Sequence, residues 1–174
     1  ARIYIQNNPD NNIDQLITLG SPHKGVPSLY YLWSGGDLNN SLPVWQRIEA
    51  GLLVHLRKPG FSTTMEAIRF TVPSLKNLLP TFNYLKENSL EKDLISMTEK
   101  NEWLININDN LPDHLFNNLH TVAGVTAENT LRWINVNDPN WLDKILGLWS
   151  DGKPKTEEKA QGDWTVLAES AILP

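Results

Sequence analysis

The side chains of this sequence that could carry acid–base or nucleophilic chemistry do not form a complete set. The 174 residues include four histidines and no cysteine, which removes thiolate chemistry, disulfides and cysteine-ligated zinc. No two histidines have the spacing of a metal site, and Asp109, Asp113 and His114 are typical of the first turn of a helix. We therefore expect neither a bound metal nor a cofactor.

Ser21 and Lys24 have the Ser-x-x-Lys spacing with which some enzymes acylate a serine. That chemistry needs both side chains on one helical turn, whereas these two follow a strand-like run and precede Gly25. The accompanying Ser-Asp-Asn and Lys-Thr-Gly motifs are absent. We interpret residues 21–25 as the turn after a strand, in which the His23 ring bonds backbone groups instead of acting as a base.

The first 43 residues predict one strand that must position this turn. Ala1 to Gln6 suits the tail of a helix, which the cluster of Asn, Pro and Asp at residues 7–12 ends. Ile13 through Leu19 is apolar enough to be a buried strand of a parallel sheet. Residues 20–43 hold four glycines and three prolines and predict a long loop.

The middle of the chain has helical patterns. Apolar residues at four-residue spacing predict a helix from Pro43 to Pro59. Thr63 and Glu66 form a possible capping box for a short helix that follows. Asn88 and Glu91 form a second such box, and the apolar face behind it predicts a helix over residues 88–107.

The last third returns to strands. Residues 120–125 and 130–136 are rich in β-formers, and the second run alternates apolar and polar residues as a one-sided strand does. Residues 141–149 predict a short amphipathic helix, and residues 151–161 a charged loop. The fold class is therefore α/β. Because a crossover between parallel strands needs only one helix, the long helical stretch between the strands indicates an insertion.

Four stretches resemble parts of the α/β-hydrolase family, in the family's order. Leu16–Gly25 resembles the strand and turn after the nucleophile elbow of lipase-like members, and Gly162–Val166 resembles the segment that carries the acid of the catalytic triad. Trp33–Asp37 resembles a post-strand loop, and Pro73–Pro80 resembles the Pro-Ser-x-x-x-Leu-Leu-Pro element of lecithin:cholesterol acyltransferase-like lipases. The resemblance implies part of a parallel hydrolase sheet with a large helical cap.

This resemblance implies a domain layout and a sheet arrangement. Residues 1–25 and 119–174 would be segments of the hydrolase core, and residues 26–118 would be the helical cap or lid. The strand before the cap and the strand after it are neighbours in the family. We therefore expect Leu16–Leu19 and Thr121–Val125 to lie side by side and parallel in one sheet.

The resemblance also assigns one catalytic residue. Asp163 would accept the Nδ1 proton of a histidine, hold its tautomer and stabilise the imidazolium that forms as a serine attacks an ester. No Gly-x-Ser-x-Gly occurs here, so the serine is expected just upstream of Ala1 and the histidine downstream, and the chain alone should be inactive. Trp164 stands where the family usually has glycine. The alternative role for Asp163 is a loop carboxylate that caps Thr165 or Val166.

The implied function is that of a serine lipase or esterase acting on lipid-like or apolar esters. Of the seven tryptophans, we expect Trp33 and Trp164 to contact substrate. An acyltransferase or deacylase of the same fold is the alternative enzyme, and a lipid- or protein-binding module on the same scaffold is the alternative outside catalysis.

Composition limits the partners. A net charge of −5, with no Lys/Arg cluster longer than Arg57-Lys58, excludes a nucleic-acid footprint, and no apolar run is long enough to span a membrane. Composition does not determine the compartment. If the chain is an interior piece of a hydrolase, its uncovered sheet faces should make it self-associate.

Overall fold

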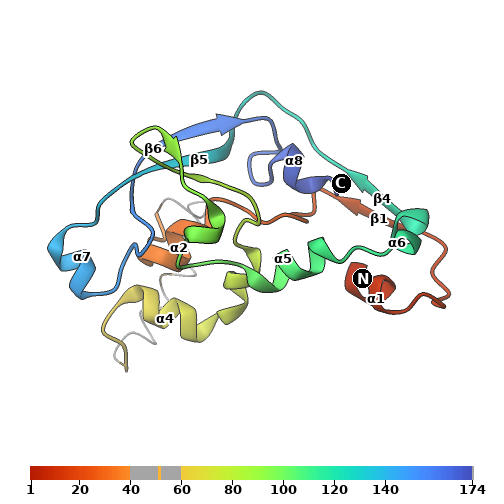
Figure 1. The fold of residues 1–174 in the computed structure, drawn as a ribbon, viewed down its shortest axis with the longest axis horizontal. Helices are drawn as coiled ribbons and strands as arrows, with labels where there is room; N and C mark the ends of the chain where they lie inside the picture. Colours follow the sequence, from red (N-terminus) through yellow and green to blue (C-terminus); the bar gives the residue numbers. More distant parts are fainter. Residues whose placement is uncertain (40–50, 52–59, 174) are drawn as a thin grey trace.

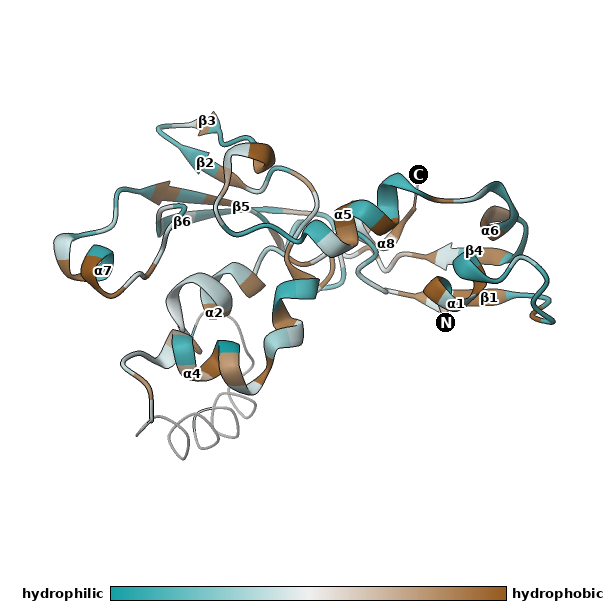
Figure 2. Ribbon diagram, turned by 60° about the horizontal axis from the view of Figure 1, so that its bottom comes forward, coloured by the Kyte–Doolittle hydropathy of each residue, from teal (hydrophilic) through white to brown (hydrophobic). Residues whose placement is uncertain are grey.

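The computed structural model describes residues 1–39, 51 and 60–173. It is a mixed α/β structure with two sheets, a two-stranded parallel sheet and a four-stranded mixed sheet. Figure 2 shows the parallel pair with α1 and α6 at one end of the molecule, the mixed sheet with α2, α4 and α7 at the other, and α5 and α8 between them. Apart from Gly51, the predicted helix at Pro43–Pro59 and His55 within it lie outside the described residues.

The parallel sheet confirms that the two segments pair side by side, but the second strand begins two residues earlier than Thr121 and ends at Val122, so residues 123–125 lie outside it. Strands β1 (Leu16–Leu19) and β4 (Leu119–Val122) lie side by side (Figure 1), with Leu16 opposite Leu119 and Leu19 opposite Val122. Helices α1 (Arg2–Asn7) and α6 (Asp113–Asn118) cover one face, where Ile5 and Leu115 are fully buried. The His114 Nε2 atom donates to the Ile5 carbonyl at 2.9 Å and so joins the two helices.

The mixed sheet has the strand order β3-β2-β5-β6 and forms the larger core. Its strands are β2 (Leu85–Glu87), β3 (Leu90–Glu91), β5 (Thr130–Asn137) and β6 (Lys153–Ala160). The aromatic rings of Tyr30, Tyr84 and Trp149 pack together here, with centroids 5.7–5.8 Å apart. Strand β5 confirms the strand expected at 130–136, but it pairs with β2 and β6 and lies in a different sheet from β4.

Short helices surround this core. They are α2 (Leu29–Gly35), α4 (Thr64–Thr71), α7 (Trp141–Ile145), α8 (Ala168–Ala171) and the 3-10 helices η2 (Pro73–Leu78) and η3 (Leu94–Ser96). The capping box before α4 is confirmed, because Thr63 Oγ1 accepts from the Glu66 amide and the Glu66 carboxylate accepts from the Thr63 amide. Helix α7 confirms the first part of the helix expected at residues 141–149, but it ends at Ile145, and Gly147 and Trp149 have left-handed backbones.

The helix predicted over residues 88–107 is wrong. Asn88 and Ser89 both have left-handed backbones, with φ of 51° and 66°, and they form the turn of the antiparallel β2–β3 hairpin. A pair of left-handed residues suits a two-residue hairpin turn and cannot start a helix. Within this stretch the only described α-helix is α5 (Glu102–Asp109), which follows the 3-10 helix η3. Its N-cap is Asn101, whose Oδ1 accepts from the Leu104 amide at 3.0 Å.

Two predicted loops also proved to be regular elements. Residues 20–43 contain α2, which is short but buries Tyr30, Leu32 and Trp33, so tertiary packing stabilises a helix that its length alone would not. Residues 151–161 contain β6, an edge strand with exposed charges. Charged side chains are common on edge strands because they discourage pairing with other chains.

Glu99 joins the helices to the mixed sheet. Its carboxylate pairs with Arg69 at 2.8 Å and accepts from the Trp33 indole at 2.8 Å, and the Arg69 guanidinium lies 4.7 Å from the centre of the Trp33 ring. The buried carboxylate of Asp151 accepts from the backbone amides of Thr98 and Glu99 at 2.6 and 2.9 Å. Each buried charge in this network has a partner, which is the condition for burying it at low cost.

The second face of the parallel sheet is bare, and we predict that it makes the chain self-associate. Ile17, Leu19 and Val122 are 58, 72 and 49% exposed, although parallel sheets are normally covered on both faces. We expect dimers or larger oligomers at micromolar concentration, measured by light scattering after size-exclusion chromatography. Leu19→Lys should shift the chain toward monomer, because it places a charge on this face.

Leu90→Lys is the matched control, because Leu90 is 73% exposed on β3, away from the parallel sheet. It should leave the oligomers unchanged. A wild-type chain that remains a clean monomer for days, without precipitation, would contradict this prediction.

Candidate functional site

Asp163 lies in a tight loop, and its carboxylate accepts hydrogen bonds from the backbone of that loop. Oδ1 accepts from the amides of Thr165 and Val166 at 3.0 and 2.7 Å, and the Asp163 amide donates to the Val166 carbonyl at 3.1 Å. Gly162 and Leu167 close the loop through a β-bridge. The capping role considered for Asp163 is therefore present, and it occupies one carboxylate oxygen.

The second oxygen, Oδ2, lies against the carboxyl ends of the two parallel strands. A Cβ atom added to Gly20, the residue after β1, would lie 2.8 Å from Oδ2. A Cβ added to Gly124, two residues after β4, would lie 3.1 Å from the Asp163 Cβ. No hydrogen bond within the described residues ends on Oδ2. This oxygen can therefore accept a hydrogen bond from a further group at the edge where α/β proteins bind their ligands.

Three of the family-like stretches, far apart in sequence, meet at the turn after β1. The Val26 amide donates to the Leu78 carbonyl at 2.8 Å, and the Thr81 amide donates to the Lys24 carbonyl at 2.9 Å. From the other side, Ser170 Oγ donates to the Gly25 carbonyl at 2.7 Å. The turn at residues 20–26 thus contacts both the Pro73–Pro80 element and the helix that follows the Asp163 loop.

Trp164 adopts a backbone conformation that favours glycine. Its φ is +77°, its amide donates to Thr130 Oγ1 at 3.0 Å, and its side chain is 71% exposed. A non-glycine residue in the left-handed region is strained, and such strain is often found at functional sites. The large ring is therefore held in solvent beside Asp163 at a conformational cost.

Trp33 lies elsewhere. It is 6% exposed within α2, and its polar contacts are those with Arg69 and Glu99. No described hydrogen bond, ion pair or ring contact joins Trp33 to the Asp163 loop. The expected substrate contact of Trp33 remains a prediction.

The His23 ring does not bond backbone groups, so that expectation is wrong. The ring is 7% exposed, and its nitrogens contact side chains, with Nε2 2.9 Å from Thr18 Oγ1 and Nδ1 3.5 Å from Arg2 Nη1. Burial, together with the positive charges of Arg2 and Lys24, lowers the pKa of His23 to about 4. Ser21 lies outside any helix, as expected for a turn.

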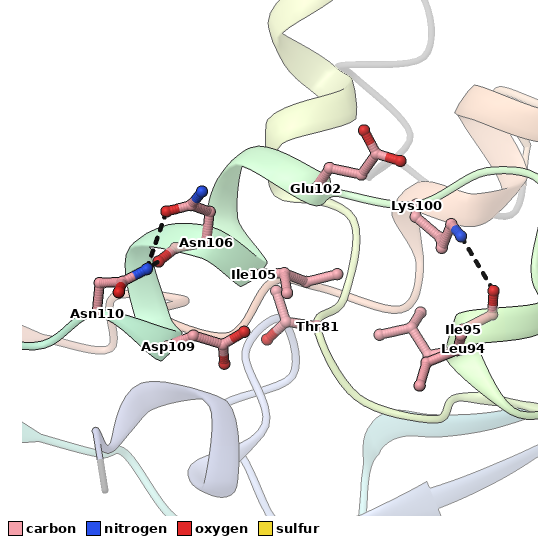
Figure 3. Close-up of a pocket in the computed structure, with 9 residues that line it drawn as sticks. All are labelled: Thr81, Leu94, Ile95, Lys100, Glu102, Ile105, Asn106, Asp109 and Asn110. Carbon is pink, nitrogen blue, oxygen red and sulfur yellow. Dashed lines mark hydrogen bonds between the residues drawn. The ribbon is translucent and has the colours of Figure 1, made fainter.

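A cavity of about 420 Å³ lies beside α5, lined by Thr81, Ile95, Ile105 and Asp109 among others (Figure 3). None of the residues expected to do chemistry lines it. Its cation, Lys100, donates to the Ile95 carbonyl at 3.0 Å, and carboxylates line the same cavity. This mixture of charges selects no ligand class.

Three residues that contact the Asp163 loop were not predicted from the sequence: Gly20, Gly124 and Thr130. The available signal was a glycine soon after each parallel strand, which marks a close backbone approach. Thr130 carries no such signal, because its role depends on the tertiary contact of its hydroxyl with the Trp164 amide.

Comparison with known proteins adds no relative: no protein-family model matches this chain, and no curated protein matches it. The resemblance to hydrolases therefore rests on the four short stretches of sequence alone. Within the described residues, no helix has the length and apolarity needed to cross a membrane, and no group of three or more His, Asp or Glu side chains could hold a metal.

Trp164→Gly should stabilise the fold. Relief of the left-handed strain at φ +77° should raise the free energy of unfolding by about 1 kcal/mol relative to Trp164→Ala. The alanine variant removes the same ring and keeps a Cβ atom, so it isolates the backbone effect. Urea denaturation of the two variants measures the difference, and equal stabilities would show that the backbone here is unstrained.

His23 should make stability pH-dependent in a defined window. The folded protein keeps His23 neutral down to a pKa of about 4, while the unfolded chain binds a proton near the ordinary 6.5. The free energy of unfolding should therefore fall by about 2–3 kcal/mol as the pH drops from 6.5 to 4.

His23→Gln should remove this part of the pH dependence, because glutamine does not titrate. His120→Gln is the control, since His120 is exposed on β4. Urea denaturation across this pH range measures both. Parallel profiles for wild type and His23→Gln would show that His23 is not held neutral.

Proposed function

We propose that this chain is part of a serine ester hydrolase of the α/β-hydrolase type, with Asp163 as the triad acid. The observation that carries the proposal is the position of Asp163 Oδ2 at the carboxyl ends of the parallel strands β1 and β4, free of described hydrogen bonds. In such enzymes the acid occupies this edge of the sheet. The meeting of three family-like stretches at residues 20–26 supports the same assignment.

The two oxygens of the Asp163 carboxylate have different proposed roles. Oδ1 holds the loop in place through the Thr165 and Val166 amides, so the carboxylate is oriented before any partner arrives. Oδ2 accepts a hydrogen bond from the Nδ1–H of a histidine and so fixes the tautomer whose Nε2 takes the proton of the attacking serine. As the acyl-enzyme forms, the Asp163 charge stabilises the imidazolium and remains ionised.

The proposed substrate is a lipid-like or apolar ester. Trp164 supports this, because a 71% exposed indole beside the acid offers a large apolar contact surface to an acyl or alkyl group. An acyltransferase would use the same residues with an alcohol in place of water. A binding module on this scaffold would keep the loop without chemistry.

Asp163→Asn tests the proposal in the longer protein that supplies the serine and the histidine. Asparagine preserves size and an acceptor for the loop amides, but it favours the wrong histidine tautomer, so ester hydrolysis should fall by up to about 10⁴-fold. The 174-residue chain alone should show no hydrolysis above background, since it has no Gly-x-Ser-x-Gly elbow.

Gly20→Ala is a second variant that leaves the acid intact. The new methyl group would meet Oδ2 at 2.8 Å, at a residue whose φ is +56°, so it should displace the carboxylate and also lower the rate. Asp14→Asn is the control, because it removes a charge from an exposed site before β1 and should leave the rate of ester hydrolysis unchanged. Full activity of Asp163→Asn would refute the assignment of Asp163 as the triad acid. A longer protein without any esterase or acyl-transfer activity would favour a binding module on the same scaffold.

A further inference from the structure

A second cavity, of about 270 Å³, lies just beyond the carboxyl end of β1. Four segments line it: α1 with Arg2, the turn after β1 with His23, η2 with Leu78, and α5 with Trp103 and Leu104. These segments come together through the same turn that contacts Asp163. The cavity is distinct from the one in Figure 3, with which it shares no lining residue.

Arg2 is a cation without a described counterion. No carboxylate among the described residues lies within ion-pair distance of its guanidinium, and no Asp or Glu lines the cavity. Burial lowers the pKa of Arg2, which means that its charged form has lost hydration. A partly buried charge of this kind costs free energy unless an anion compensates it.

His23 orients the guanidinium without competing for an anion. Because arginine can only donate, the 3.5 Å contact with Arg2 Nη1 makes His23 Nδ1 the acceptor, and Nε2 then donates to Thr18 Oγ1 at 2.9 Å. One guanidinium nitrogen is thereby directed at the ring. The other N–H groups of Arg2 remain available for a forked contact with a planar oxoanion.

The walls around this cation are mainly apolar. Leu104 is 5% exposed, while Ile3, Leu78 and Trp103 present 36, 39 and 48% of their surface to solvent. Free phosphate would gain nothing from such walls, whereas an alkyl chain would. The chain as a whole carries a charge of −5, so attraction of an anion here must come from the local site.

We propose that this cavity binds an aliphatic carboxylate, with the carboxylate on the Arg2 guanidinium and the alkyl chain against Leu78 and Trp103. Binding requires no catalysis, so the site does not depend on the proposed esterase. If the esterase assignment also holds, the ligand matches the acid that ester hydrolysis releases.

Calorimetric titration of the 174-residue chain with hexanoate tests the proposal. An acetylated N-terminus keeps the Ala1 amine, which also lines the cavity, from adding a charge. Hexanoate should bind at least about 10-fold more tightly than hexanol, which lacks the charge, and than inorganic phosphate, which lacks the chain. Phosphate or hexanol binding as tightly as hexanoate would overturn the assignment.

Variants locate the site. Arg2→Gln should weaken hexanoate binding by about 10-fold or more. The hexanoate affinity of Arg2→Lys should lie between those of wild type and Arg2→Gln, because lysine keeps the positive charge and loses the two-pronged guanidinium contact. Lys24→Gln is the matched control: it removes one positive charge from a residue that does not line the cavity and should change affinity by less than about 2-fold. Equal affinity of wild type and Arg2→Gln would refute the site.

A measurement on the wild-type chain avoids any question of variant folding. At about pH 7, where hexanoate is ionised and His23 is neutral, a carboxylate bound on Arg2 should shift the imidazole NMR resonances of His23, whose Nδ1 lies 3.5 Å from Arg2 Nη1. The resonances of exposed His120 serve as the internal control. His23 resonances that saturating hexanoate leaves unchanged would place the ligand elsewhere.

Discussion

The turn at residues 20–26 is the constraint on which the arrangement of the site depends. Gly25 has φ of +86°, and a Cβ atom there would lie 2.3 Å from the Leu79 carbonyl oxygen, so only glycine allows the η2 segment to approach. Gly20 has φ of +56° and admits the Asp163 carboxylate in the same way. Two glycines in one turn therefore permit close contact with segments about 55 and 140 residues away in the chain, which is the positional use of glycine in a fold.

This constraint explains why a small parallel sheet can hold a carboxylate in place. The β1–β4 pair supplies the edge, Gly20 supplies the space, and the amides of Thr165 and Val166 hold one carboxylate oxygen. The loop is stabilised although Trp164 adopts a left-handed backbone within it. A fold that keeps a strained, exposed aromatic residue beside an oriented carboxylate is consistent with selection for a function at this position.

Local patterns in the sequence predicted those elements whose signals are themselves local. The apolar run Ile13–Leu19 with a following glycine predicted β1, although the strand begins at Leu16 and is exposed at Ile17 and Leu19, so the expectation of a buried strand is wrong. Thr63 with Glu66 predicted the start of α4. The pairing of β1 with β4 required the family resemblance as well. The helix prediction over residues 88–107 failed because the capping-box spacing of Asn88 and Glu91 also fits a hairpin. Only the left-handed backbones of Asn88 and Ser89 distinguish the hairpin from the helix. Strand β6 was missed because its charges suit an edge strand as well as a loop, and pairing with β5 is not visible in composition.

Asp163 Oδ2 is proposed to accept a hydrogen bond from a histidine at the carboxyl edge of the parallel strands. Proton NMR of the longer protein tests it most directly, because an imidazole Nδ1–H bonded to a carboxylate gives a strongly deshielded resonance. This resonance should be present in the wild type, be lost in Asp163→Asn, and survive the exposed-site change Asp14→Asn. A resonance that persists unchanged in Asp163→Asn would show that another group holds the histidine and that Asp163 is not the triad acid.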